Sequence, residues 1–184
     1  MSARPRSAWI IALALACATS SPAETEDEAT GEAKVLRALI DAAAWSATTP
    51  EDDPFAAHRP AEVDCGLAGW TVEGGILEID TNYCDYVTLQ QSSLVAVEAG
   101  DVIDLELGHF DLTAPAPTQA HYAVQLGEVV IWERELSIPR PGTVYRETIT
   151  ASQAFPAGAP VYVHLHNHGQ NNYQLYRLDA EVRG

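Results

Sequence analysis

Three histidines recur at every second position near the end of the 184-residue chain, at His164, His166 and His168. Residues two apart in an extended strand point to the same face, so this spacing predicts a row of imidazoles on one side of a strand. Imidazole nitrogens bind zinc and copper. The row is therefore a candidate metal site. The alternative is an exposed or hydrogen-bonded row on an edge hairpin that holds no metal.

The same strand carries a candidate for ligand binding. Tyr162 is in phase with His164 and His166, and Asn167 and Asn171 lie in the turn that follows. Aromatic rings pack against the C–H faces of sugars, while amides and imidazoles hydrogen-bond to hydroxyl groups. These five residues form the predicted ligand-binding set. His109 and His121 could complete a metal site only if the order of the strands brings them close.

Short runs of β-branched and aromatic residues, separated by Gly and Pro, predict the strands that position these side chains. The predicted strands cover residues 69–72, 76–80, 86–90, 94–97, 102–109, 120–126, 129–136, 143–150, 161–167 and 173–182. Several runs alternate, as where Ile103, Leu105 and Leu107 oppose Asp104 and Glu106. One buried and one wet face per strand predicts an all-β fold, an antiparallel β-sandwich of the jelly-roll type. Apolar residues at helical spacing predict one short helix over residues 33–45.

The last hairpin of the chain resembles that of jelly-roll carbohydrate-binding modules and galactose-binding-like domains. The residues that carry this resemblance are Asn167, Gly169, Asn171, Tyr173, Leu178 and Asp179. The resemblance implies a carbohydrate or glycoconjugate as ligand. It also implies a calcium site that joins an early strand, through Glu78 or Asp80, to Asp179 on the last strand. Calcium takes six to eight oxygen ligands, and the alternative is a solvated acidic face.

Most of the chain also resembles a group of bacterial surface lipoproteins of the myxobacterial type, a group that brings no known activity with it. The matching elements are Asp53-Pro54-Phe55 with His58-Arg59-Pro60, the pair Cys65 and Cys84, Trp132-Glu133, Ile138-Pro139, and the run from His164 to Gly169.

Composition excludes some partners and disfavours others. The formal net charge is −16, which argues against nucleic acid and against electrostatic docking on anionic lipid. Neither a nucleophile elbow, nor a phosphate-binding loop, nor a dinucleotide fingerprint occurs in the sequence. The sequence therefore favours a binding protein over an enzyme.

The beginning of the chain predicts export. Arg4 and Arg6 precede an apolar run over residues 8–16, and Cys17 follows as in a bacterial lipobox. We expect a signal peptide over 1–16, lipid on Cys17, an acidic flexible tether over 17–32 and one domain over 33–184. The alternative is an ordinary signal peptide, cut after Ala16 or Ala23.

The two remaining cysteines, Cys65 and Cys84, favour a disulfide in an oxidising compartment over two buried thiols or a zinc site. The sequence thus predicts an exported, lipid-anchored binding module of the cell envelope with a glycan ligand. A metal-binding protein that uses the histidine row, and a structural or adhesive protein without a small ligand, are the alternatives.

Overall fold

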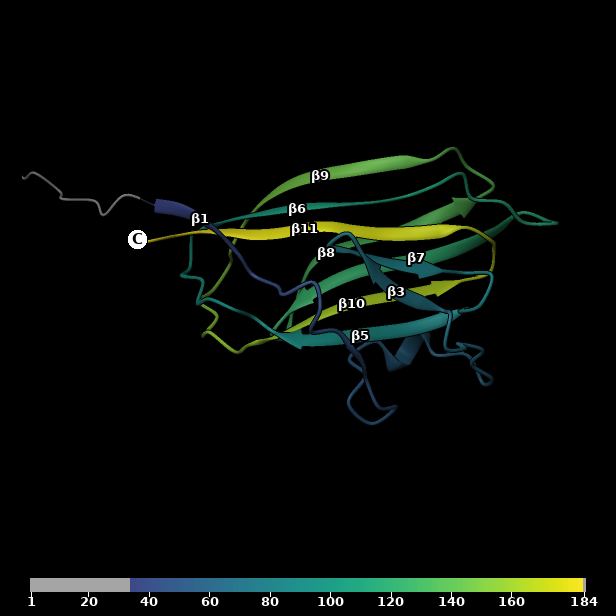
Figure 1. Ribbon diagram of the computed structural model, residues 1–184, viewed down its shortest axis with the longest axis horizontal. Coiled ribbons are helices and arrows are strands. Elements are labelled where there is room, and N and C mark those ends of the chain that lie inside the picture. Colours follow the sequence, from purple (N-terminus) through teal and green to yellow (C-terminus); the bar gives the residue numbers. More distant parts are fainter. Residues whose placement is uncertain (1–33, 184) are drawn as a thin grey trace, which may run out of the picture. The chain divides into compact units, whose positions relative to one another are not determined.

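The computed structural model describes residues 34–183, which form eleven strands and one short 3-10 helix (Figure 1). The elements in chain order are β1 (Lys34–Ala38), β2 (Ser46–Ala47), η1 (Ala56–His58), β3 (Trp70–Glu73), β4 (Ile76–Asp80), β5 (Tyr86–Ser92), β6 (Val102–His109), β7 (Thr118–Leu126), β8 (Val129–Ile138), β9 (Thr143–Thr150), β10 (Pro160–Asn167) and β11 (Asn172–Arg183).

The strands pair into two antiparallel sheets. One has six strands, in the order β3-β4-β11-β6-β9, with β1 paired to the end of β11. The other has five strands, in the order β2-β5-β10-β7-β8. The two four-stranded sets β4-β11-β6-β9 and β5-β10-β7-β8 have the strand order of a jelly roll. The predicted fold class, an antiparallel jelly-roll sandwich, is therefore confirmed.

The core lies between the sheets and contains the inward side chains of both. Tyr122 stands at its centre, edge-on to Trp132 and to Tyr173, with ring centroids 5.4 Å apart in both pairs. All three rings are at most 5% exposed. Burial of aromatic and branched apolar side chains drives the two layers together. The alternate residues of each strand face outward, and on the five-stranded sheet they form the surface described below.

Alternation predicted most strands well. β4, β6 and β9 have the predicted bounds, and six of the other predicted strands differ by one or two residues at their ends. Residues 94–97 are an exception, because Val97 forms only an isolated bridge with Phe155.

The predicted helix over residues 33–45 is wrong. Its described part begins with an edge strand, in which Lys34–Ala38 pair with Asp179–Arg183 of β11. The Leu39 amide then donates to the Leu178 carbonyl, and the Leu39 carbonyl accepts from the Leu94 amide. Buried Leu39 and Trp45 anchor this extended segment. The end of β11 therefore supplies the hydrogen-bond partners of this segment. Pairing with that distant strand outweighed the helical spacing of the apolar residues.

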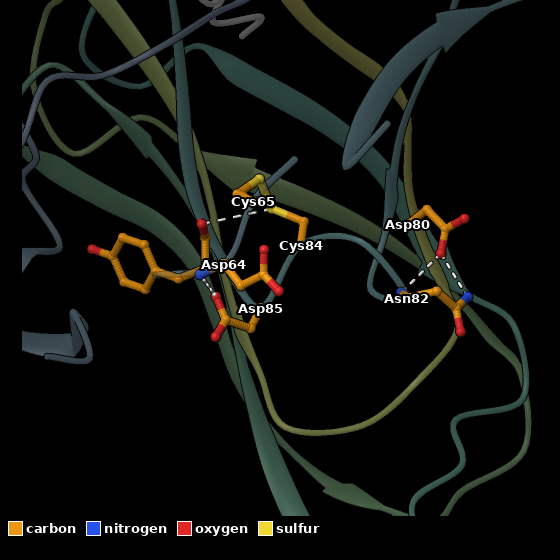
Figure 2. The surroundings of a disulfide bond; sticks show 7 residues. Asp64, Cys65, Asp80, Asn82, Cys84 and Asp85 are labelled. Atoms are coloured by element: carbon orange, nitrogen blue, oxygen red, sulfur yellow. Dashed lines mark hydrogen bonds between the residues drawn. A yellow bond between two sulfur atoms is a disulfide. The ribbon is translucent and has the colours of Figure 1, made fainter. Parts of the chain in front are cut away.

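The predicted disulfide is confirmed. Cys65 and Cys84 are bonded, and they also form an isolated antiparallel bridge (Figure 2). Beside them, the Asp64 amide donates to the Asp85 carboxylate, and the Asp85 amide donates to the Asp64 carbonyl. The disulfide thus ties the segment before β3 to the start of β5.

The predicted signal peptide, the lipid on Cys17 and the tether over 17–32 lie outside the described residues. Within residues 34–183, no helix is long and apolar enough to cross a membrane.

Candidate functional site on the five-stranded sheet

The outward face of the five-stranded sheet carries three of the predicted site residues, Tyr162, His164 and His166, whereas Asn167, Asn171 and the implied calcium ligands lie elsewhere. Residues directly opposite each other on paired strands share a face, so the register arranges them in three rows. The histidine row consists of Tyr86, His166, His121 and Glu135; the middle row of Thr88, His164, Ala123 and Glu133; and the glutamine–tyrosine row of Ser46, Gln90, Tyr162 and Gln125.

A loop over residues 48–60, which we call the strap, packs on the histidine row and the middle row. Asp53 fixes it, because this buried carboxylate accepts hydrogen bonds from the Tyr86 hydroxyl (2.5 Å) and from the Phe55 amide (2.9 Å). The Arg59 guanidinium lies 3.7 Å from the same carboxylate and 5.1 Å from the centre of the Tyr86 ring. Burial, followed by the hydrogen bond to Asp53, raises the pKa of Tyr86 above its usual range.

His164 is closed off beneath the strap. It is fully buried, and its ring stacks against Phe55 with centroids 4.5 Å apart. Its Nδ1 is 2.8 Å from the Thr88 hydroxyl. Burial, with smaller contributions from neighbouring histidines, lowers the pKa of His164 to about 2. His164 is therefore a neutral residue that solvent does not reach, and the three predicted histidines do not share one open face.

The other two predicted histidines meet residues from elsewhere in the chain. A hollow of about 170 Å³, which we call the histidine hollow, is lined by His58, Gln119, Ala120, His121, Glu135, His166 and His168. His121 lines the histidine hollow because its strand, β7, pairs with β10. His109 does not, because it lies on β6 in the other sheet. His58 comes from η1 in the strap, and its ring stacks on that of His121 at 3.9 Å.

The glutamine–tyrosine row lies beyond the strap. Gln90 and Tyr162 are half-buried, whereas Gln125 is 8% exposed and is held by a hydrogen bond from its Nε2 to the Gly127 carbonyl (2.8 Å). The row begins in a hollow of about 570 Å³ that is lined by Asp41, Ala44, Ser46, Gln90, Gln91, Ser92, Leu94 and Pro160. Gln91 is 8% exposed, and its Nε2 has no hydrogen-bond partner among the described residues.

The side chains of Asn167 and Asn171 make hydrogen bonds within the protein. Asn167 is buried, donates to the Gly169 carbonyl and accepts from the Tyr173 hydroxyl. Asn171 has a φ of 146° and donates from its side chain to the Asp111 carbonyl. Both amides thus hold the turn between β10 and β11, and neither enters the site proposed below.

The implied calcium ligands are not brought together. Glu78 accepts from the side chains of Asn172 and Gln174, and Asp80 accepts from Asn82. Asp179 pairs with Asp104 much farther along β11 and lies 3.5 Å from the Arg177 guanidinium. Five residues of extended strand separate Asp179 from the partner of Glu78, a distance of about 16 Å.

The strap was missed by sequence reasoning. Residues 48–60 contain three prolines and no predicted strand, yet Asp53, Phe55 and His58 all contact the sheet. The signal that could have found it is the pair of motifs Asp53-Pro54-Phe55 and His58-Arg59-Pro60, which the sequence indicated only as elements of a resemblance.

No protein-family model matches this chain, and no curated protein matches it. Among solved structures, its matches include carbohydrate-binding modules. A structure described as CBM4 is 15% identical with a TM-score of 0.40, covering 63% of this chain and 97% of that one. The second N-terminal cellulose-binding domain of Cellulomonas fimi β-1,4-glucanase C is 14% identical with a TM-score of 0.39, covering 84% and 97%. A TmCBM61 module in complex with β-1,4-galactotriose is 11% identical with a TM-score of 0.36, covering 83% and 92%. At such TM-scores and identities, these likenesses do not establish what this chain binds.

Proposed function

We propose that the chain is a glycan-binding module whose binding surface is the glutamine–tyrosine row and the hollow beside it. The observation that carries this proposal is the register of the sheet, which sets Tyr162 between Gln90 and Gln125. An aromatic ring can pack against the C–H face of a sugar, and amides on both sides can read its hydroxyl groups. A protein surface of this composition is suited to sugars.

The hollow at the end of the row adds further hydrogen-bonding groups. Ser46, Gln90 and Ser92 line it together with the carboxylate of Asp41. The unpartnered Nε2 of Gln91 is a buried donor, and such a donor costs free energy until a ligand or water accepts from it. A sugar hydroxyl is one group that can do so.

The charge of the chain narrows the class of glycan. A formal net charge of −16 repels anionic polymers at physiological ionic strength. We therefore propose a neutral oligosaccharide or polysaccharide as the ligand.

A glycan array probed with the purified chain tests this proposal. We expect binding to neutral glycans, with Tyr162→Ala weakening it by at least about tenfold, or ~1.4 kcal/mol. The matched control is Tyr83→Ala, because Tyr83 is an exposed tyrosine in the segment between β4 and β5. Absence of any glycan signal would contradict the proposal and favour a structural or adhesive role. Equal binding by the Tyr162 variant would exclude this surface and place the glycan elsewhere on the chain.

We further propose that the domain is exported and held at the cell envelope by lipid on Cys17. The apolar run before Cys17 supports this location, and the disulfide is consistent with an oxidising compartment. Cys17→Ala should move the protein from the membrane fraction to the soluble fraction. A mature N-terminus that begins at Glu24 without lipid would contradict the anchor.

A further inference from the structure

The histidine hollow gathers groups that bind transition metals. One ligand atom each from His58, His121 and Glu135 lie within 4.8 Å of one another. These residues come from η1, β7 and β8, so the fold brings them together across long stretches of sequence. His166 and His168 line the same hollow, with their ring centroids 4.5 Å apart.

The two nitrogens of His121 have different surroundings. Nε2 lies 2.6 Å from the carboxylate of Glu133. His121 is 4% exposed, and its buried Nδ1 finds no hydrogen-bond partner within residues 34–183. If Nε2 carries the hydrogen that Glu133 accepts, Nδ1 keeps its lone pair. Histidines that ligate metals commonly donate their other ring N–H to a carboxylate in this way.

A second unpaired nitrogen lies across the strand pair. His166 is directly opposite His121, and its Nε2 is also buried without a partner in the described part of the chain. Unpaired buried polar atoms are uncommon, and an unseen ion or water is an ordinary reason for them. Several imidazoles beside a carboxylate form a donor set that suits a metal ion.

We propose that the histidine hollow is a binding site for a divalent transition metal of the zinc type. Its ligands are His58, His121 and Glu135. His166 lies outside that 4.8 Å group but lines the same hollow with an unpartnered Nε2, and it is the fourth ligand once the site closes. Zinc accepts imidazole nitrogens and carboxylate oxygens in a four-coordinate site. This ligand set shares only His166 with the row that the sequence suggested.

Binding requires a small closure of the site. Ligand atoms of a tetrahedral zinc site lie about 3.3 Å apart, since each bond is about 2.0 Å. The His58 and His121 rings are parallel within 2°, so one ring must turn before both lone pairs can meet one ion. His58 is half-buried in a loop and Glu135 is exposed, so both can move, whereas His121 is held by Glu133.

The metal would connect the strap to the sheet, because His58 belongs to the strap and the other ligands belong to β7, β8 and β10. This inference is independent of glycan binding, which we assign to another row. Tyr162→Ala should therefore leave metal binding unchanged.

Calorimetric titration of the full chain with zinc chloride, without a polyhistidine tag, tests the site. We expect one zinc per chain and a rise in melting temperature. His58→Ala and Glu135→Gln should each weaken zinc binding by at least about tenfold. Both residues are partly or fully exposed, so neither change removes a core side chain. The cobalt complex should show the absorption of a tetrahedral ion.

Two controls match these variants. Glu73→Gln alters another exposed glutamate on a strand, and His109→Asn alters the one histidine outside this region, so both should bind zinc as the wild type does. Failure of the wild type to bind zinc would overturn the proposal. Zinc binding that survives both His58→Ala and Glu135→Gln would overturn it as well.

Discussion

At the scale of single residues, Asp53 holds the strap against the sheet. Its side chain is fully buried, and it accepts from the Tyr86 hydroxyl and the Phe55 amide while Arg59 lies nearby. A buried carboxylate is tolerated only where donors and a positive charge compensate the loss of water. The position of His58 over His121 therefore depends on a hydrogen bond made elsewhere in the strap.

Tyr86→Phe should test that dependence. The change keeps the ring and removes the donor, which leaves the Asp53 carboxylate less well satisfied. We expect a loss of about 1–3 kcal/mol in the free energy of unfolding, measured by denaturant titration. The control Tyr83→Phe removes an exposed hydroxyl and should change stability by less than about 0.5 kcal/mol. Equal effects of the two changes would contradict the role given to Asp53.

His109 makes stability depend on pH. Burial, reinforced by nearby Arg140 and opposed by the carbonyl of Phe110, lowers the pKa of His109 below 6.5. The unfolded chain then binds more protons than the folded chain as the pH falls. The contribution of His109 to the free energy of unfolding is therefore fully present above the unfolded pKa of about 6.5 and is lost progressively as the pH falls below it.

His109→Asn should flatten the dependence of stability on pH. Asparagine can still donate to the Phe110 carbonyl, which His109 Nδ1 contacts at 2.7 Å, and it does not titrate. Free energies of unfolding at pH 8 and at pH 5 should differ less for the variant than for the wild type. Parallel pH profiles for the two proteins would show that His109 is not the group responsible.

At the scale of elements, the alternation of apolar and polar residues predicted the strands whose bounds depend on local sequence. The run of Ile103, Leu105 and Leu107 against Asp104 and Glu106 gave β6 its bounds, because side chains two apart share a face. It could not predict β1, whose hydrogen bonds depend on the distant end of β11. Val35 and Leu36 of β1 are exposed, so burial did not mark that strand either.

The candidate site shows the same limit. Period two correctly placed Tyr162, His164 and His166 on one face of β10. The sequence could not show that the strap covers His164 and leaves Tyr162 open, because that contact joins residues about 110 positions apart. His58 and Glu135 became candidates only once the strands were ordered.

The turn between β7 and β8 contains a glycine whose backbone conformation and packing can both be tested. Gly127 has a φ of 57°, and an added Cβ would lie 3.2 Å from the Phe155 ring. Gly74, between β3 and β4, has a φ of 60° and nothing within 4 Å of an added Cβ. Gly74→Ala should lose about 1 kcal/mol from the left-handed backbone alone. Gly127→Ala should lose about 1 kcal/mol more of the free energy of unfolding, because its Cβ would also contact Phe155. Thermal or denaturant unfolding of both variants measures the difference. Equal losses would contradict the contact with Phe155.

At the scale of the whole domain, one sheet carries both proposed sites on its outer face. The strap lines the histidine hollow through His58 and covers His164 of the middle row, and the glutamine–tyrosine row lies beyond it. The six-stranded sheet bears polar and charged side chains that largely pair with one another, such as Glu106 with Arg146 at 2.8 Å. Surface pairs of this kind contribute little energy and give no indication of a ligand. We therefore propose that recognition takes place on the five-stranded sheet.

The most direct test is to map binding by nuclear magnetic resonance, using the neutral oligosaccharide with the strongest array signal. Titration should shift the side-chain amide resonances of Gln90 and Gln125 and the ring resonances of Tyr162. The amide of Gln174, which donates to Glu78 on the six-stranded sheet, should not move. Shifts centred on the six-stranded sheet, with none at Gln90, Gln125 or Tyr162, would contradict the proposed binding face.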